Sequence, residues 1–123
     1  MFMKSRINSQ LGEIYFDQDV IARFAAQSAS ECFGVVGLAS VNMKDGLAKL
    51  LKNENIIQGV NLEVVEDVIH IDLHIIVAYG VSISAVADNL MHDVKYRVEE
   101  FCGISVEEVN VYVEGVRVLD EED

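Results

Sequence analysis

Three side chains with metal-binding chemistry alternate along one short stretch of the chain, His70, Asp72 and His74. In a β-strand, residues two apart point to the same face, so neighbouring members of this set would lie about 6.6 Å apart. Imidazole and carboxylate groups are ligands that zinc and other divalent transition metals bind well. A fourth ligand could come from Glu63 or Glu66 on a paired strand. This spacing defines a candidate metal site.

The same three residues also fit a strand surface that does no chemistry. Apolar residues alternate with them along the stretch, at Ile69, Ile71, Leu73, Ile75 and Val77. A strand with one face in the core and the other in water shows this same alternation. We favour this second interpretation, and so expect no bound metal or cofactor. His70, Asp72 and His74 stay the candidates for the less favoured metal-binding function.

A second group of side chains has the spacing of a general base on a helix. Asp88 and His92 are one helical turn apart, with Tyr96 one turn further on. A carboxylate that orients an imidazole is a common arrangement in acid–base catalysis. However, the sequence predicts no nucleophile or oxyanion-binding loop nearby. An Asp–His pair at this spacing more often stabilises a helix surface by about 0.2–0.5 kcal/mol.

Nucleotide chemistry has no support in the glycine pattern. The chain contains no GxGxxG following a strand and no GxxxxGK[ST], the motifs that cradle phosphate groups. Two cysteines, Cys32 and Cys102, are too few and too far apart to indicate a disulfide framework or a zinc site. We expect both to be reduced and packed in the interior. Together these observations predict that the protein is not an enzyme.

The elements that position these side chains are clearest in the second half of the chain. Alternation predicts a strand over 68–79, paired with a strand over 59–66 in an antiparallel hairpin. A helix follows, capped by Ser82 or Ser84 and ended by Gly103. The final strand alternates valines with Asn110, Tyr112 and Glu114, which form a solvated face. We take these three residues as candidate contacts for a protein partner.

The first half of the chain is less regular. Residues 11–16 predict a short strand, and Asp17 predicts the start of a helix that runs to about Ser30. Glycines break up the next strand-like run, which indicates a bulge. Residues 44–55 predict a short amphipathic helix and a polar loop. The fold class that follows is α+β, a mostly antiparallel sheet of about four strands with two main helices packed on one face.

Composition limits the classes of partner. The 123 residues include 21 acidic and 9 basic side chains, a formal net charge of −12. Such a chain is repelled by nucleic acids and by anionic lipids. The basic cluster of Lys44, Lys49 and Lys52 lies beside Asp45 and Glu54, so it forms only a weak positive patch. No apolar run approaches the roughly 20 residues that span a bilayer, and the start has no secretory signal pattern. We therefore expect a cytoplasmic protein without nucleic-acid binding or direct membrane insertion.

The chain is expected to form one domain over residues 11–118, preceded by an N-terminal extension at 1–10 and followed by an acidic tail at 119–123. Within it, three stretches are characteristic: IDLHIIVAYG, the long helix with Val94–Lys95 and Val98–Glu99, and the closing VNVYVEGV. From roughly residue 12 to 118 the chain resembles the alkaline shock protein family of Gram-positive bacteria, an envelope stress-response family. Many relatives carry Thr-Gly after the long helix, where this chain has Cys102-Gly103.

This resemblance implies a small cytoplasmic α+β protein with no known catalytic residues. It also implies self-association, and recruitment to the inner face of the cell membrane by a small membrane-anchored protein. The favoured hypothesis is a non-enzymatic binding and assembly module in cell-envelope homeostasis, which acts through protein contacts. The alternative is an accessory subunit that modulates a soluble cytoplasmic enzyme. The identity of the partner, the oligomer number and the stress signal do not follow from the residues.

Overall fold

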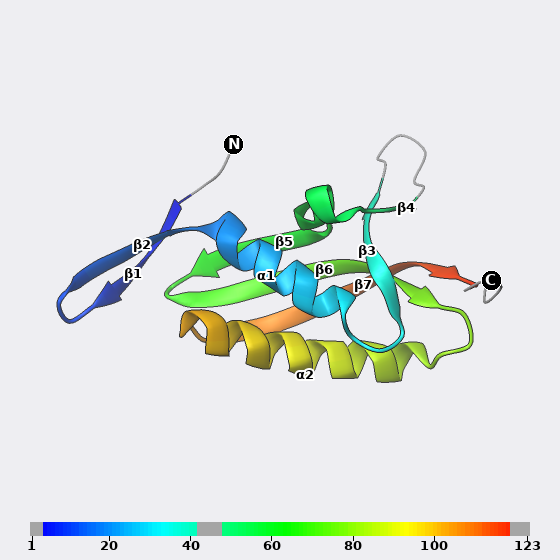
Figure 1. The fold of residues 1–123 in the computed structure, drawn as a ribbon. Coiled ribbons are helices and arrows are strands. Elements are labelled where there is room, and N and C mark those ends of the chain that lie inside the picture. Colours follow the sequence, from blue (N-terminus) through cyan, green and yellow to red (C-terminus); the bar gives the residue numbers. More distant parts are fainter. Residues whose placement is uncertain (1–3, 42–47, 119–123) are drawn as a thin grey trace.

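The fold is built around one long central strand, β6 (Val68–Ala78) (Figure 1). The structure is a computed structural model that describes residues 4–41 and 48–118. The odd-numbered residues of β6 from Ile69 to Val77 are almost completely buried under the helices. His70, Asp72 and His74 lie between them on the opposite, partly exposed face. The predicted alternation of this strand is therefore confirmed.

Four further strands complete the main sheet. Strand β7 (Val106–Arg117) runs parallel to β6 along its length. On the other edge of β6, β5 (Val60–Val65) pairs with the first half and β3 (Val35–Val41) with the second half, both antiparallel. The short strand β4 (Ala48–Leu50) extends the sheet from β3.

This arrangement confirms the α+β class but corrects the expected sheet. The sheet has five strands, not about four, and it is mixed. The parallel pair arises because α2 (Ile83–Cys102) carries the chain back along the sheet before β7 begins. A parallel pair needs a long crossover, and the helix supplies it.

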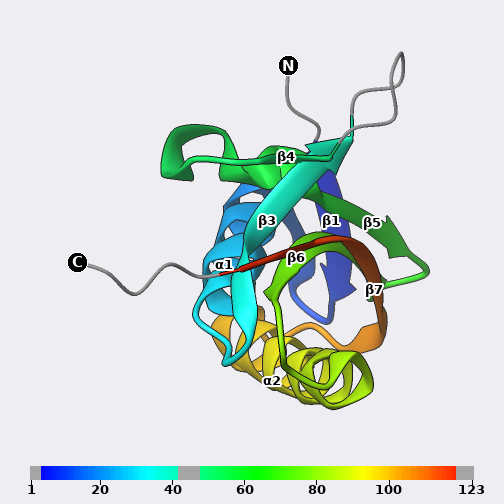
Figure 2. The same ribbon diagram turned by 90° about the vertical axis from the view of Figure 1, so that its right-hand side faces the viewer.

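Both main helices, α1 (Gln18–Ser30) and α2, cover the same face of the sheet (Figures 1 and 2). Asp17 caps α1 by accepting a hydrogen bond from the backbone N–H of Asp19 at 3.0 Å, and Ser82 caps α2 in the same way through Ala85 at 3.3 Å. Gly103 ends α2 with a φ of +73°. The small buried residues of α1 let its backbone approach the sheet closely: Ala22, Ala25, Ala26 and Ala29.

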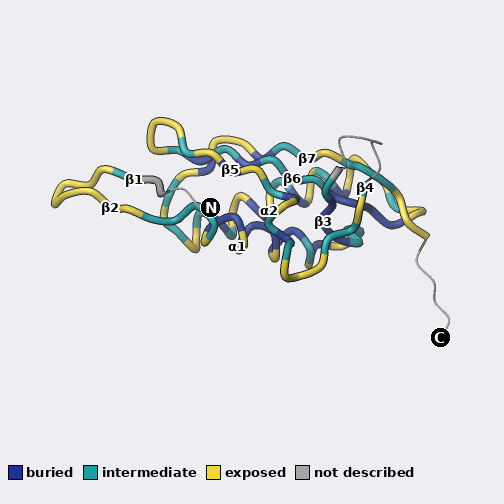
Figure 3. The backbone as a smooth tube through the Cα atoms, turned by 90° about the horizontal axis from the view of Figure 1, so that it is seen from above, coloured by how far each residue is buried: buried dark blue, intermediate teal, exposed yellow. Residues whose placement is uncertain are grey.

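A separate two-stranded hairpin precedes α1. It consists of β1 (Lys4–Ser9) and β2 (Gly12–Asp17), which pair antiparallel. The hairpin projects from one end of the molecule and is largely exposed (Figures 1 and 3). Strand β2 confirms the strand expected at 11–16, whereas β1 lies in residues that the sequence analysis assigned to an N-terminal extension.

The helix expected within residues 44–55 is wrong in the part of that range that the structure describes. Ala48–Leu50 forms β4, and a 3₁₀-helix, η1 (Asn53–Gly59), follows. Pairing with Ala39–Val41 overrides the local helical pattern. Leu50 lies close over Gly37, where an added Cβ would come within 2.9 Å of Leu50 Cδ1. Residues 44–47 and the acidic tail at 119–123 lie outside the described residues.

Candidate functional site: the polar face of the sheet

The face of the sheet opposite the helices carries a set of polar side chains on β6 and β7, which we call the polar ladder. Its members are His70, Asp72 and His74 of β6 with Glu108, Asn110, Tyr112 and Glu114 of β7. The register pairs His70 with Glu108, Asp72 with Asn110, and His74 with Tyr112. The parallel pairing of the two strands brings the two candidate sets of the sequence analysis together.

Each β6 member of the polar ladder contacts a β7 side chain. His70 Nδ1 lies 3.5 Å from Glu108 Oε2. The Asn110 side-chain amide donates a hydrogen bond to Asp72 Oδ1 at 3.0 Å.

His74 has two partners on β7. Its Nδ1 lies 2.6 Å from Glu114 Oε2, and its ring stacks on Tyr112 with 4.7 Å between the ring centroids and 15° between the planes. These contacts fix the orientation of Tyr112 and Glu114 while leaving part of Tyr112 in water. The polar ladder is therefore a surface of positioned side chains.

The geometry does not gather the ligands that the metal hypothesis needs. His70, Asp72 and His74 turn toward separate partners on β7. Glu63 is opposite His70 in the β5–β6 register, and Glu66 lies in the turn beyond it. Within residues 4–41 and 48–118, no three His, Cys, Asp or Glu side chains come close enough to hold a metal ion together.

The second candidate group, Asp88, His92 and Tyr96, does not form one site. His92 Nδ1 lies 2.9 Å from the backbone oxygen of Asp88 and 3.9 Å from its carboxylate, and both side chains are 75% exposed. Tyr96 does not complete the arrangement, because its hydroxyl is hydrogen-bonded to Glu100, which raises the pKa of Tyr96. The structure thus forms a surface pair on α2 and not a general-base arrangement.

Both cysteines are free, with Cys32 buried and Cys102 partly buried. The Cys32 thiol donates to the backbone oxygen of Ser28 at 3.5 Å and to Asp93 Oδ2 at 3.3 Å. Burial, together with the nearby Asp93 carboxylate, raises the pKa of Cys32 to about 11. A thiol with such a pKa is a poor nucleophile at neutral pH.

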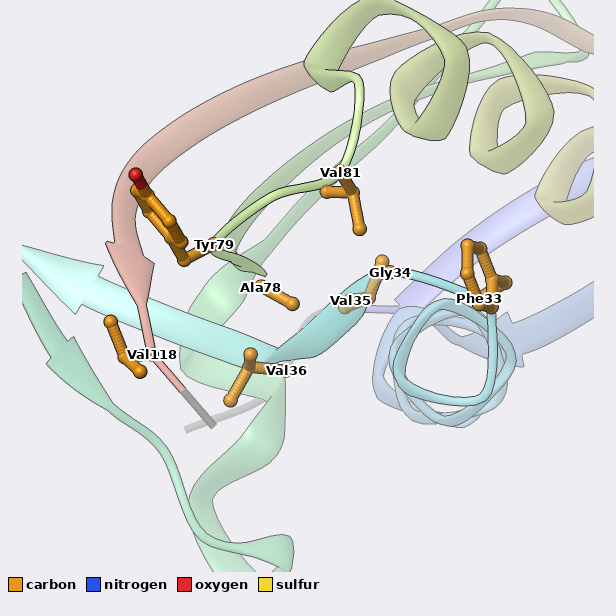
Figure 4. A pocket seen from close by; sticks show the side chains of 8 residues that line it. All are labelled: Phe33, Gly34, Val35, Val36, Ala78, Tyr79, Val81 and Val118. Carbon is orange, nitrogen blue, oxygen red and sulfur yellow. The ribbon is translucent and has the colours of Figure 1, made fainter. Parts of the chain in front are cut away.

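Two apolar hollows were missed by the sequence analysis. One, of about 500 Å³, lies where β3 begins and β6 ends, between Phe33, Val36, Tyr79, Val81 and Val118 (Figure 4). The other, of about 400 Å³, lies between the β1–β2 hairpin and the helix ends. The first of these hollows leaves large side chains in water, since Phe33 is 80% exposed and Tyr79 is 73% exposed. The signal available in the sequence was a large apolar residue beside a glycine at an element end, as in Phe33-Gly34 and Tyr79-Gly80.

The sequence and fold can now be compared with known proteins. The profile of a family described as having a cell envelope-related function matches residues 6–118. The chain belongs to the alkaline shock protein family. This membership confirms the resemblance that the strand and helix motifs indicated.

Two related proteins and one solved structure differ in how similar they are to this chain. The uncharacterized protein YloU of Bacillus subtilis (strain 168) is 44% identical over 119 residues, which cover 96% of this chain and 99% of YloU. A stress response regulator gls24 homologue of Streptococcus pyogenes serotype M3 is 28% identical, over 89% of this chain and 62% of that protein. A solved structure of the MamM CTD is 14% identical, with a TM-score of 0.48, over 86% of this chain and 90% of that one.

None of these descriptions names an enzymatic activity. In residues 4–41 and 48–118, no helix is both long enough and apolar enough to cross a membrane.

Proposed function

We propose that this protein is a non-enzymatic binding module of the cell-envelope stress response, which docks protein partners on the polar ladder and on the adjoining edge of β7. The observation that carries the proposal is that one edge of β7 has no partner strand among the described residues. Among the described strands, β7 pairs with β6 alone, so its other edge carries no strand. At Val106 the backbone is bound by Glu99 and Lys95 of α2, and the edge is open to an added strand beyond that residue. An open edge offers backbone donors and acceptors to an added strand.

The polar ladder supports this proposal because its side chains are already ordered. Asn110, Tyr112 and Glu114 are held by hydrogen bonds and ring stacking to β6. A partner that binds ordered side chains loses less conformational entropy on association. The family's cell envelope-related function and the gls24 homologue's description as a stress response regulator support the envelope context.

The direct experiment places a photo-crosslinking amino acid at Tyr112 of the native protein in its own cells. Tyr112 is 46% exposed, so the probe reaches solvent. A matched control carries the same probe at His92, which is exposed on α2. We expect a Tyr112-specific adduct with a small membrane protein in the membrane fraction. If adducts form equally at both positions, or at neither, the polar ladder is not the docking surface.

The same experiment separates the alternative function, an accessory subunit of a soluble cytoplasmic enzyme. That alternative shares the surface, and the dispersed catalytic candidates are compatible with both. A Tyr112 adduct found only with a soluble enzyme would overturn the envelope proposal in favour of the alternative.

Self-association through the β7 edge has a separate test. Backbone N–H groups alternate in direction along a strand, so one of Asn110→Pro and Val111→Pro removes an outward-facing donor. The proline variant that loses only an outward-facing donor should keep the fold, and circular dichroism will identify which of the two it is. We expect this variant to dissociate oligomers in analytical ultracentrifugation. Alanine at the same position is the control. A folded proline variant with unchanged self-association would exclude this edge.

A further inference from the structure

An apolar groove of about 400 Å³ lies at the hairpin end of the molecule, away from the polar ladder. Three parts of the chain form it: the β1–β2 hairpin, the start of α1, which directly follows the hairpin, and the end of α2, which is distant from both in sequence. We call it the hairpin groove, and its main apolar residues are Ile7, Ile14, Phe16, Val20, Phe101 and Ile104.

The hairpin groove leaves large apolar side chains half in water. Ile14 and Val20 are each 55% exposed, and Phe101 is 49% exposed. Phe101 is nevertheless fixed, since its ring stacks on Phe24 with 4.2 Å between centroids. The hairpin itself has no third strand in the described part of the chain, and two-stranded sheets are marginally stable alone. A partner that covered the groove would bury this surface and support the hairpin.

The charges around the hairpin groove are predominantly negative. Asp17 lines it, and Asp19 follows in the first turn of α1. Of the described basic side chains toward this end of the molecule, Arg6 pairs with Glu13 at 3.1 Å and Lys95 pairs with Glu99 at 2.9 Å. Arg23 donates a hydrogen bond to the backbone oxygen of Asn53 at 3.4 Å.

The end of α2 adds to this negative potential. Its last residue, Cys102, and the following Gly103 both line the groove. The last turn contains Glu100, beside Glu99 that is already paired with Lys95, and no basic residue. The negative end of the helix dipole is therefore uncompensated there, and a cation is favoured at this position.

These charges discriminate among the occupants that an apolar groove accepts. A fatty acid or a phospholipid would bring an anionic head group beside carboxylates. A second copy of this chain that packed groove against groove would bring two acidic rims together. A basic amphipathic helix satisfies both features, because its apolar face fills the groove and its lysine and arginine side chains face the acidic rim.

We propose that the hairpin groove binds the apolar face of a basic amphipathic helix of a partner protein. This proposal rests on the proposed function as a protein-binding module, and it specifies the chemistry of a partner at a second surface. The polar ladder and the hairpin groove are then separate contact sites on one molecule.

The test uses a designed helical peptide of leucine and lysine as the probe, with an otherwise identical leucine and glutamate peptide as its control. Binding to the full chain is measured by fluorescence anisotropy and mapped by amide chemical shifts in NMR. We expect the lysine peptide to bind and to shift residues of the hairpin groove, such as Ile14, Val20 and Ile104. The glutamate peptide should not bind.

Val20→Glu is the informative variant. It places a charge in the apolar groove but makes the protein more acidic, so non-specific attraction of the lysine peptide would increase. We expect about tenfold weaker binding, which corresponds to about 1.4 kcal/mol, because a carboxylate replaces an apolar side chain that the partner would bury. Val20 is more than half exposed and lies in the first turn of α1, where a carboxylate is favourable, so the fold should persist. Tyr79→Ser, at the other apolar hollow, is the matched control and should bind normally.

Three outcomes would overturn the proposal: chemical shifts spread over the acidic surface, chemical shifts centred on Tyr79, or unchanged affinity in Val20→Glu. A change of oligomeric state in Val20→Glu alone would also overturn it, and would make the groove an interface between copies. The Tyr112 crosslinks report on the polar ladder independently, so failure of one proposal leaves the other interpretable.

Discussion

His74 Nδ1 on β6 lies 2.6 Å from Glu114 Oε2 on the neighbouring parallel strand β7. The two side chains are 31% and 24% exposed, so water screens their contact only in part. Forty residues and the whole of α2 separate them in sequence. The contact therefore depends on the crossover that makes β7 parallel to β6, and it links the two strands on the face away from the helices.

We expect this contact to stabilise the fold measurably. A double-mutant cycle of His74→Ala and Glu114→Ala should give a coupling energy of about 0.5–1.5 kcal/mol in urea unfolding at neutral pH, because the two residues touch and are partly buried. A parallel cycle on His92 and Asp88 is the control. Both of these residues are 75% exposed, so their coupling should be smaller, at most about 0.2–0.5 kcal/mol. Equal coupling in the two cycles would contradict a special role for the His74–Glu114 contact.

Gly34 is expected to tolerate no side chain. Its φ is +86°, and an added Cβ would lie 2.5 Å from Val86 Cγ2 of α2. Gly34→Ala should therefore lower the free energy of unfolding by about 1–3 kcal/mol. Gly80→Ala separates backbone strain from the steric contact with Val86. Gly80 has a φ of +95°, but an added Cβ would meet nothing within 4 Å. If both substitutions cost the same, backbone strain alone accounts for the effect and the Val86 contact contributes nothing.

The turn between β5 and β6 is expected to be suboptimal. Its two central residues, Glu66 and Asp67, have φ values of +53° and +67°. Asn-Gly is the preferred pair where both central residues have positive φ. Replacing both residues with Asn-Gly should raise the free energy of unfolding by about 0.5–1 kcal/mol, because Asn and Gly adopt positive φ at a lower cost than Glu and Asp. As a control, Asn61→Gly in β5 should lower it, because glycine weakens a strand interior. Loss of stability in the Asn-Gly variant would contradict the turn assignment.

Cys32 predicts a loss of stability at high pH. Its pKa is raised from 9.0 to about 11 in the folded protein, mainly by burial. The unfolded thiol therefore ionises first, which favours the unfolded state as pH rises from about 9 to about 11. The contribution of the neutral Cys32 thiol to the free energy of unfolding is complete below about pH 9 and is lost between about pH 9 and pH 11. Cys32→Ala, compared by urea unfolding at several pH values, should show a shallower decline than the wild type, and parallel curves would contradict the assigned cause.

The sequence alone predicts many of the strands and helices, because their positions depend on interactions between residues that are close in the chain. Alternation located β6, and the cap expected at Asp17 placed the start of α1. For α2 the sequence offered Ser82 or Ser84, and the structure shows Ser82 as the cap. Gly103 placed the end of α2 because it readily adopts a left-handed conformation. Each of these features depends on residues within a few positions of one another. The family resemblance, which depends on the same motifs, was confirmed for the same reason.

The tertiary structure decided the features that depend on distant residues. Ala48–Leu50 became a strand because it pairs with β3, although its local pattern suggested a helix. The direction of β7 and the polar ladder followed from the path of α2 across the sheet. The hairpin groove exists because two helix ends meet beside β1 and β2. Local propensity cannot specify such pairings, since their energy comes from contacts that form only when separate parts of the chain pack together.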